Sequence, residues 1–268
     1  MFDCHLHSSF SSDSTMDTEI ACETSIKLGL EGIAFTDHYD YDYPGFEDEF
    51  NIDFEQYSKK LEFLRTKYFE HLKILKGIEV GYQPHAIEKT NQIVNSLDFD
   101  FVIGSVHIID GFDPYENDDF FRGKSKHEAY IRYLEEIYAS VSEFNNFDVI
   151  GHIGYIRRYG HYNDRSLRYC DYNDLLEMIF KKVIQNGKGI EINSSGFKSE
   201  LLNSPMPDFD LIKRYKELGG EIICVGSDAH APEHIALNFG CIYDRLKEMG
   251  FRYTTHFENR VAVFDLLK

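Results

Sequence analysis

Two histidines separated by a single residue stand near the start of the chain, directly after a short apolar run. His5 and His7 occupy alternate positions of the segment Phe2-Asp3-Cys4-His5-Leu6-His7. In an extended segment, side chains two residues apart point to the same side, so both imidazoles can converge on one ion where the strand ends. Histidine nitrogen is a common ligand of divalent metals, so this pair is a candidate metal clamp.

The same arrangement, an apolar run that stops at a histidine, an acid or an amide, recurs along the whole chain. The residues at these run ends are His5, His7, Asp37, His38, Glu79, His107, His152, Glu191, Asn193, Asp228 and His230. An isolated histidine is more often a hydrogen-bonded core residue or a helix cap than a ligand. Seven runs that end in this way, with six of the twelve histidines among them, indicate instead a polynuclear site for zinc, manganese or iron.

The other six histidines are not assigned as ligands. His85 is a spare candidate because it follows closely after Glu79. The remaining ones fall in expected helices or surface loops: His71, His127, His161, His234 and His256.

Seven short, β-rich apolar segments must position the ligands. They are Met1–Cys4, Gly32–Phe35, Ile74–Ile78, Phe99–Ile103, Phe147–Ile150, Lys188–Ile192 and Glu221–Val225. Because these segments are apolar throughout rather than alternating, they predict a parallel sheet that is covered on both faces. A single β/α barrel domain over residues 1–268 is the leading fold, with an open doubly wound sheet second.

Helical periods separate most of these segments. Tyr57, Leu61, Leu64 and Tyr68 follow a possible cap at Asp53. A second period follows Ser125, and Glu128 completes a capping box there. Three more helices are expected before Gly29, Gly187 and Gly219, since glycine commonly follows the last turn of a helix.

Two long connections follow suspected ligands. The loops 39–51 and 108–124 are rich in acidic and aromatic residues and are longer than barrel closure requires. Loops at the carboxyl ends of barrel strands form the active-site face, so we expect both at the rim of the site.

Composition and charge limit the possible partners. A net charge of −18 disfavours nucleic acid, because it repels a phosphate backbone. No apolar run is long enough to span a membrane, and no signal-peptide pattern stands at the N-terminus. The five scattered cysteines have no metal-binding spacing and are expected to be free thiols in a reducing cytoplasm, with Cys4 as buried filler.

The order of the motifs H-x-H, T-D-H, G-I-E, G-S-V-H, G-H and S-D-A-H resembles the PHP (polymerase and histidinol phosphatase) family over essentially the full length. Within that family, the acidic loop after Thr36-Asp37-His38 and the runs Gly104–Asp113, Gly151–Arg158 and Glu191–Lys198 resemble the monofunctional histidinol-phosphate phosphatases. The resemblance implies a distorted seven-stranded β/α (TIM-like) barrel that holds three metal ions.

The resemblance also implies the ligand sets. One ion would be held by His5, His7, Glu79 and Asp228; a second by Glu79, His107 and His152; and a third by Asp13, His38 and His230. Many family members carry a histidine at the position of Asp13, and an oxygen ligand there favours iron or manganese over zinc. Asp13 could alternatively cap the helix that follows it.

The implied reaction is hydrolysis of L-histidinol phosphate to L-histidinol and phosphate in histidine biosynthesis, by a metal-bridging hydroxide that attacks phosphorus. Either Arg157 or Arg158, together with Lys198, would meet the developing charge on the phosphoryl oxygens. Asp37, His85 or a metal-bound water would protonate the leaving oxygen. The acids Asp40, Asp42, Asp110 and Asp113, beside Tyr39 and Phe112, would hold the cationic leaving group.

Other functions share these metal ligands. Another PHP phosphoesterase, acting on phosphotyrosine or on a nucleotide 3′ end, would need the same ligands, although acidic loops count against nucleic acid. A non-catalytic metal-binding domain would show degenerate ligands, whereas every ligand position here is filled. A metal-dependent amidohydrolase would carry a lysine at the end of a middle strand, where this chain has His107 and His152.

Overall fold

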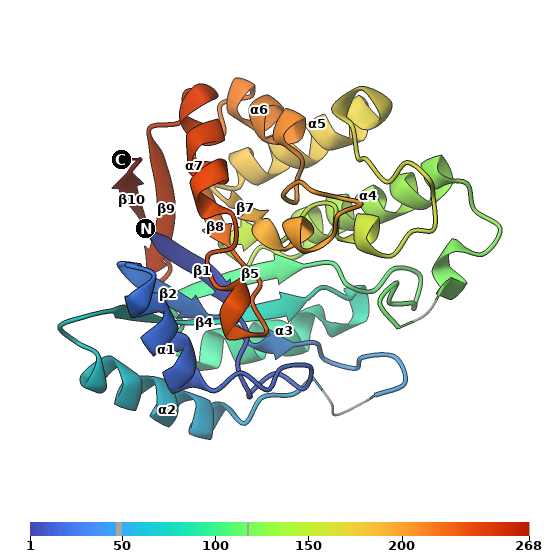
Figure 1. Cartoon of the computed structure of the whole chain (residues 1–268). Coiled ribbons are helices and arrows are strands. Elements are labelled where there is room, and N and C mark those ends of the chain that lie inside the picture. Colours follow the sequence, from blue (N-terminus) through green and yellow to red (C-terminus); the bar gives the residue numbers. More distant parts are fainter. Residues whose placement is uncertain (47–49, 117, 268) are drawn as a thin grey trace.

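Seven parallel strands form a nearly closed barrel in the computed structural model, which describes residues 1–46, 50–116 and 118–267 (Figure 1). In sheet order the strands are β1 (Phe2–Leu6), β2 (Gly32–Phe35), β4 (Lys73–Gly81), β5 (Phe101–Ser105), β6 (Val149–Ile150), β7 (Gly189–Asn193) and β8 (Ile223–Gly226). A short strand, β3 (His38–Tyr39), also pairs with β4. Because the sheet order follows the chain order, the fold is the predicted barrel and not the open doubly wound sheet.

The first and last strands of the barrel meet at a seam. A single bridge joins Leu6 to Ala229, and no continuous ladder connects β1 with β8 among the described residues. Two backbone hydrogen bonds hold the seam: the amide of His7 donates to Ala229 (3.0 Å), and the amide of Asp228 donates to His5 (2.8 Å). The seam therefore lies beside predicted metal ligands on both strands.

Seven α-helices pack around the strands in the described part of the chain (Figure 1). They are α1 (Thr18–Lys27), α2 (Phe54–Lys67), α3 (Ile87–Ser96), α4 (Lys126–Glu143), α5 (Tyr169–Gln185), α6 (Phe209–Glu217) and α7 (Phe239–Glu248). Asp53 caps α2, and Ser125 with Glu128 forms the predicted capping box of α4. No described helix has the length and apolar character needed to cross a bilayer.

Two helices were not identified in the sequence. Helix α3 follows a short 3₁₀ turn, and α7 follows Asn238 in a left-handed conformation; neither has a side-chain cap. Neither helix therefore begins with the capping hydrogen bond that marks the starts of α2 and α4.

An antiparallel hairpin of β9 (Tyr253–Glu258) and β10 (Val261–Leu266) covers the end of the barrel opposite the predicted ligands. At its turn, Asn259 and Arg260 donate backbone hydrogen bonds to Asp100, just before β5. Within the hairpin, Phe257 stacks on Phe101 with ring centroids 5.2 Å apart. The sequence analysis did not predict this hairpin.

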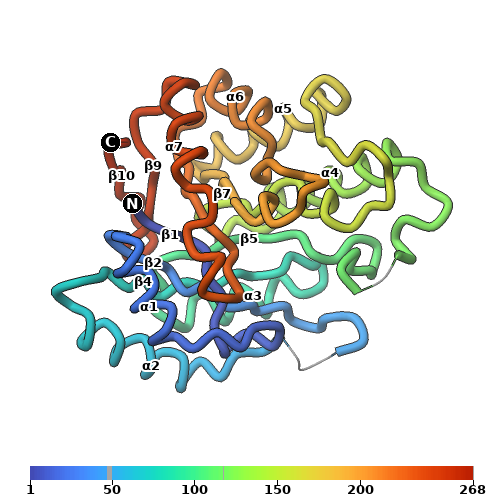
Figure 2. Tube along the Cα trace, viewed as in Figure 1, coloured from blue at the N-terminus to red at the C-terminus, as the bar shows by residue number. Residues whose placement is uncertain are grey.

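The placement of His256 in a helix or surface loop was wrong. It is buried in β9 and stacks on Phe2, with ring centroids 3.8 Å apart, so the first strand and the last hairpin lie side by side (Figure 2). Cys4 is buried in the apolar cluster that also holds Phe101 and Phe257, and Cys4 stands in none of the ligand groups.

Candidate metal centre

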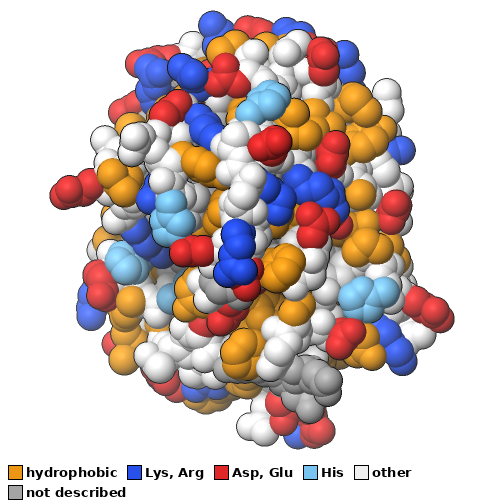
Figure 3. All heavy atoms as spheres, turned by 90° about the vertical axis from the view of Figure 1, so that its right-hand side faces the viewer, with side chains coloured by type: hydrophobic (Ala, Val, Ile, Leu, Met, Phe, Trp, Pro, Cys, Tyr) orange, Lys and Arg blue, Asp and Glu red, His pale blue; other side chains and the backbone are white. Residues whose placement is uncertain are grey.

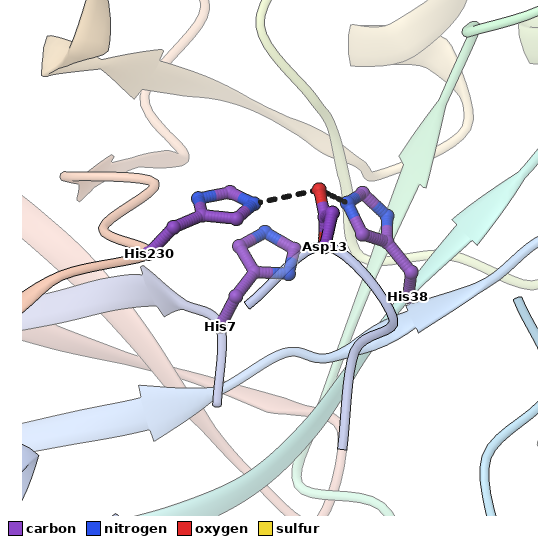
Figure 4. Close-up of side chains that lie close together, drawn as sticks. All are labelled: His7, Asp13, His38 and His230. Atoms are coloured by element: carbon purple, nitrogen blue, oxygen red, sulfur yellow. Dashed lines mark hydrogen bonds and ion pairs between the residues drawn. The ribbon is translucent and has the colours of Figure 1, made fainter. Parts of the chain in front are cut away.

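The carboxyl ends of the barrel strands bring the predicted ligands together. Three groups of imidazoles and carboxylates are close enough to share ions: His7, Asp13, His38 and His230 (Figure 4); His5, His7 and Asp228; and His38, Glu79 and His107. They come from β1 and its following loop, from β3 and β4, and from the segments after β5 and β8. Strands β1 and β4 extend further than predicted, so His5 and Glu79 lie within strands rather than just past them.

The first of the ligand groups implied by the sequence is buried and consists of His5, His7, Glu79 and Asp228. The Nε2 atoms of His5 and His7 are 3.0 Å apart, and Glu79 Oε2 lies 3.3 and 3.5 Å from them. Asp228 Oδ1 completes the group at 3.9 Å from His5 and 3.4 Å from His7. Four atoms bound tetrahedrally to one zinc ion at about 2.05 Å would lie about 3.3 Å apart. The observed spacings are therefore those of a ligand set around one ion.

Glu79 reaches a second group with its other oxygen. Its Oε1 atom lies 2.8 Å from His152 Nε2 and 3.3 Å from His107 Nε2, and these two nitrogens are 3.4 Å apart. Because Oε2 belongs to the first group and Oε1 to the second, Glu79 has the geometry of a bridging carboxylate.

The third group lies nearer the surface. Asp13 Oδ2 is 3.0 Å from His230 Nε2 and 3.6 Å from His38 Nε2, and the imidazole of His7 lies beneath them (Figure 4). Asp13 does not cap the helix that follows it, because the cap of α1 is Asp17. Asp13 therefore lies within a candidate ligand group and is not the cap of α1.

Hydrogen bonds at the far ring nitrogens orient the histidines. The Nδ1 atom of His5 donates to Glu191 Oε1 (2.6 Å), and that of His107 donates to Asp40 Oδ1 (2.9 Å). The Nδ1 atom of His230 donates to the carbonyl of Asp228 (3.0 Å). With Nδ1 protonated, Nε2 of each ring carries a lone pair that points into the site, as in histidines that bind metals.

The imidazole of His7 is held through a relay. Its Nδ1 atom donates to Ser11 Oγ (3.1 Å), and the Ser11 hydroxyl donates in turn to Asp37 Oδ1 (2.8 Å). The backbone amide and hydroxyl of Ser8 also donate to Asp37, which is fully buried and does not line the cavity. The structure thus places Asp37 behind His7 as a support and does not bring it to the position of a general acid.

The donor set fits divalent cations. With Nδ1 donating in both His5 and His7, the two Nε2 atoms face each other at 3.0 Å beside carboxylate oxygens, and a cation between them would remove the repulsion of their lone pairs. Among the described residues, the buried atoms His38 Nδ1 and Asp40 Oδ2 have no hydrogen-bond partner, although Glu79 Oε2 lies 3.1 Å from His38 Nδ1. Burial and the charges of His230 and His38 lower the pKa of His7 far below its usual value, which keeps this ring in the neutral, metal-binding form.

The two candidate arginines point in different directions. Arg158 lines the cavity, where its guanidinium donates to Asp228 Oδ2 (2.6 Å) and to Ser195. Arg157 is buried away from the cavity and pairs with Asp208 (3.0 Å). Lys198 also lines the cavity and donates to the carbonyl of Asp228 (2.8 Å). Only one of the two arginines is therefore beside the metal ligands.

The site opens into a cavity of about 440 Å³ at the face toward which the strands point. Figure 3 views this face, where basic, acidic and apolar side chains lie next to one another. Arg158 lies over the ring of Tyr155, 5.6 Å from its centroid. The cavity lining also includes aromatic and acidic side chains from the loops, namely Tyr43, Phe50, Asp113, Tyr115, Tyr155 and Tyr159. The cavity therefore combines basic, acidic and aromatic groups.

The two long loops supply part of this wall, although residues 47–49 and 117 lie outside the described residues. Among the four loop acids expected near the leaving group, only Asp40 and Asp113 line the cavity. Asp42 instead pairs with the exposed His85 (2.9 Å), and Asp110 pairs with Arg132 (2.9 Å).

Of the aromatic residues expected beside these acids, Tyr39 packs against Phe54, and Phe112 is partly exposed outside the cavity lining. The sequence analysis did not single out the tyrosines that do line the cavity. Tyr155 and Tyr159 follow His152 within one short segment, so their position after a predicted ligand was the available signal.

A parallel barrel with clustered imidazoles and carboxylates at the carboxyl ends of its strands defines a metal-dependent hydrolase. Residues 3–195 match the model of the PHP domain, and the chain belongs to this family. It is 35% identical over 240 residues to a probable histidinol-phosphatase of Clostridium acetobutylicum, covering 89% of this chain and 90% of that protein. These findings identify an enzyme of the phosphatase class.

A histidinol-phosphatase of Lactococcus lactis is 33% identical over 252 residues, which cover 93% of this chain and 91% of that protein. A crystal structure of histidinol phosphate phosphatase from Lactococcus lactis, complexed with zinc, L-histidinol and phosphate, superposes with a TM-score of 0.91 at 31% identity. The superposition covers 98% of both chains.

Proposed function

We propose that this protein hydrolyses L-histidinol phosphate to L-histidinol and phosphate, and so serves histidine biosynthesis in the cytoplasm. The observation that carries this proposal is the mixed lining of the cavity. The candidate metal ligands with Arg158 and Lys198 suit a phosphate dianion, and the buried carboxylate of Asp113 with its aromatic neighbours suits an organic cation. A substrate with both charges fits this arrangement, and the relatives support the choice.

Three divalent ions would complete the site. The ligand sets are His5, His7, Glu79 and Asp228; Glu79, His107 and His152; and Asp13, His38 and His230. When bound, such ions supply positive charge for the phosphoryl oxygens and lower the pKa of water toward neutrality. Zinc is present in the Lactococcus structure, and the oxygen ligand Asp13 favours manganese or iron in the third set.

The chain's own side chains would position the phosphoryl group. Arg158 is fixed by Asp228 and Ser195, so its guanidinium is oriented before substrate arrives. Lys198 lies beside the same aspartate and adds a second cation. Together they would stabilise the negative charge that develops on the phosphoryl oxygens.

A phosphate-release assay tests this function. The purified, metal-replete enzyme would be given L-histidinol phosphate, phosphotyrosine, nucleoside monophosphates and sugar phosphates. We expect kcat/KM for L-histidinol phosphate to exceed the others by on the order of a thousandfold, the discrimination typical of a site with matched polar contacts. The Glu79→Gln variant, purified in the same way, controls for contaminating phosphatases. A preference for phosphotyrosine or a nucleotide would refute the proposed substrate.

A further inference from the structure

Asp3 is a fully buried carboxylate that belongs to none of the ligand groups. It is 0% exposed, and both of its oxygens accept hydrogen bonds from backbone amides. Oδ1 accepts from the amide of Ser227 (2.8 Å) and, at a longer distance, from that of His5 (3.4 Å), while Oδ2 accepts from the amide of Ala236 (2.9 Å). Burial of a carboxylate is unfavourable unless hydrogen bonds replace its hydration, and here backbone amides replace it.

The carboxylate of Asp3 holds both ends of one segment, residues 227–236. The first end of this segment, Ser227, directly follows β8, and the other end lies shortly before α7. Oδ1 binds the amide at the first end and Oδ2 binds the amide at the other. Between these two points the segment carries two of the candidate metal ligands, Asp228 and His230. One side chain of the first strand thus fixes the segment that brings these ligands to the site.

The backbone of this segment has a conformation that needs support. Asp228 and Ala236 have φ angles of 53° and 55°, in the left-handed region that residues other than glycine seldom adopt. Such conformations persist only where the surrounding contacts fix them. The two amides that Asp3 holds at the shorter distances are those of Ser227, directly before Asp228, and of Ala236 itself. Asp3 therefore fixes the chain at both of these left-handed positions.

Strand pairing contributes little to the position of this segment. Across the seam, one bridge joins Leu6 to Ala229, and the amide of Asp228 donates to the carbonyl of His5 (2.8 Å). Other neighbouring strands of the barrel are aligned by ladders of several residue pairs, as between β4 and β5. At the seam, the side chain of Asp3 supplies hydrogen bonds that a ladder supplies elsewhere.

The three proposed ligand sets depend on this segment to different degrees. The first set needs Asp228 and the third needs His230, and both residues lie within the segment that Asp3 holds. The members of the second set come from β4 and from the segments after β5 and β6; they are Glu79, His107 and His152. A shift of residues 227–236 should therefore weaken the first and third sets and leave the second unchanged.

We propose that Asp3 is a positioning residue that holds Asp228 and His230 at the places where the first and third metal ions need them. The inference rests on the ligand sets of the proposed function. Asp3 does not line the cavity, so it acts through the backbone of residues 227–236 and not by contact with substrate.

The Asp3→Asn variant tests this role directly. The new side chain has only one oxygen, so its NH₂ group meets the amide of Ser227 or that of Ala236 and cannot accept a hydrogen bond from it. Competition with a chromophoric chelator should show that two of the three zinc ions bind roughly tenfold or more weakly, while the other keeps its affinity. Anomalous diffraction at the zinc edge, from crystals equilibrated with limiting zinc, should locate the retained ion in the second ligand set.

Asp148→Asn is the matched control. Asp148 is also a buried carboxylate that accepts from a backbone amide, that of Val102 (2.9 Å), but its other partner is Arg260 of the hairpin at the opposite end of the barrel. We expect Asp148→Asn to lower Tm without changing zinc affinity at temperatures well below Tm. A merely structural role of Asp3 would give the same result for Asp3→Asn.

A milder variant keeps the test decisive if Asp3→Asn does not fold. The hydroxyl of Ser227 also hydrogen-bonds to Asp3 and to the carbonyl of His5 (3.5 Å), and Ser227→Ala removes these bonds but keeps the amide donor. It should weaken the same two zinc ions by about two- to tenfold.

The outcomes separate this inference from the proposed function. Unchanged zinc affinity, or equal losses at all three ions, would refute the role of Asp3 and leave the proposed function intact. A wild-type protein that binds fewer than three zinc ions would refute the proposed ligand sets, and the role of Asp3 with them.

Discussion

Glu191 is expected to control metal affinity although it belongs to none of the three ligand groups. Its two oxygens hold ligands of different groups: Oε1 accepts from His5 Nδ1 (2.6 Å), and Oε2 accepts from the backbone amide of His152 (2.7 Å). In Glu191→Gln the neutral amide keeps the shape of the side chain, but the hydrogen bond from His5 Nδ1 no longer has a charged acceptor. A hydrogen bond to a charged group contributes about 1.5–3 kcal/mol, so its loss should weaken metal binding by roughly 10- to 100-fold.

The assay is competition for zinc with a chromophoric chelator, followed by activity at saturating metal. We expect weaker zinc retention by Glu191→Gln and recovery of most activity when metal is added in excess, because the ligands themselves are intact. Glu177→Gln is a suitable control, since Glu177 pairs with Lys181 and Arg214 on the helical surface. Unchanged zinc affinity in Glu191→Gln would contradict the view that the acid orients His5.

Three further predictions concern charge and metal. Arg158→Ala should lower kcat/KM by roughly a hundredfold with full metal content, whereas Arg157→Ala should mainly lower the melting temperature, and similar kinetics for both variants would refute the assignment. Elemental analysis of gently purified protein should find about three divalent metals per chain, and Glu79→Ala should lose two of them; a single metal in the wild type would exclude the trinuclear site. Burial alone would lower the pKa of His256, but hydrogen bonds from this ring to two hairpin carboxylates raise it, so its contribution to stability is complete below about pH 6.5 and is lost as pH rises through the raised pKa. Urea unfolding should therefore show that the stability difference between wild type and His256→Gln shrinks with rising pH, and a constant difference would contradict this.

The strands and their terminal ligands were predictable from local signals. Apolar runs that lead to His5, His38 or Glu79 locate the strands, and a parallel barrel brings their carboxyl ends to one face. The exact ends were not predictable, because β1 and β4 continue past His5 and Glu79. The capping residues of α2 and α4 were predictable for the same reason, because a cap acts over only a few residues.

The remaining features depend on side-chain direction and on distant contacts. Arg157 and Arg158 are neighbours in one 3₁₀ turn, and only the folded packing decides which of them faces the cavity. Asp113 is one of several acids in its loop, and its contacts with Tyr43 and Tyr155 join three separate segments. Asp37 was expected as a candidate general acid because it stands at the end of a strand, whereas its contacts with Ser8 and Ser11 join residues 29 and 26 positions apart.

The seam between β1 and β8 determines when, during synthesis of the chain, the metal-binding groups become complete. The ribosome makes His5 and His7 more than 200 positions before Asp228 and His230. Few backbone bonds join the two strands, so metal ions bound between these residues would act as cross-links across the closure. A nascent or truncated chain that ends before β8 would lack ligands of two of the three groups. Metal binding at those two groups therefore requires a complete barrel, and unfinished chains should show no phosphatase activity.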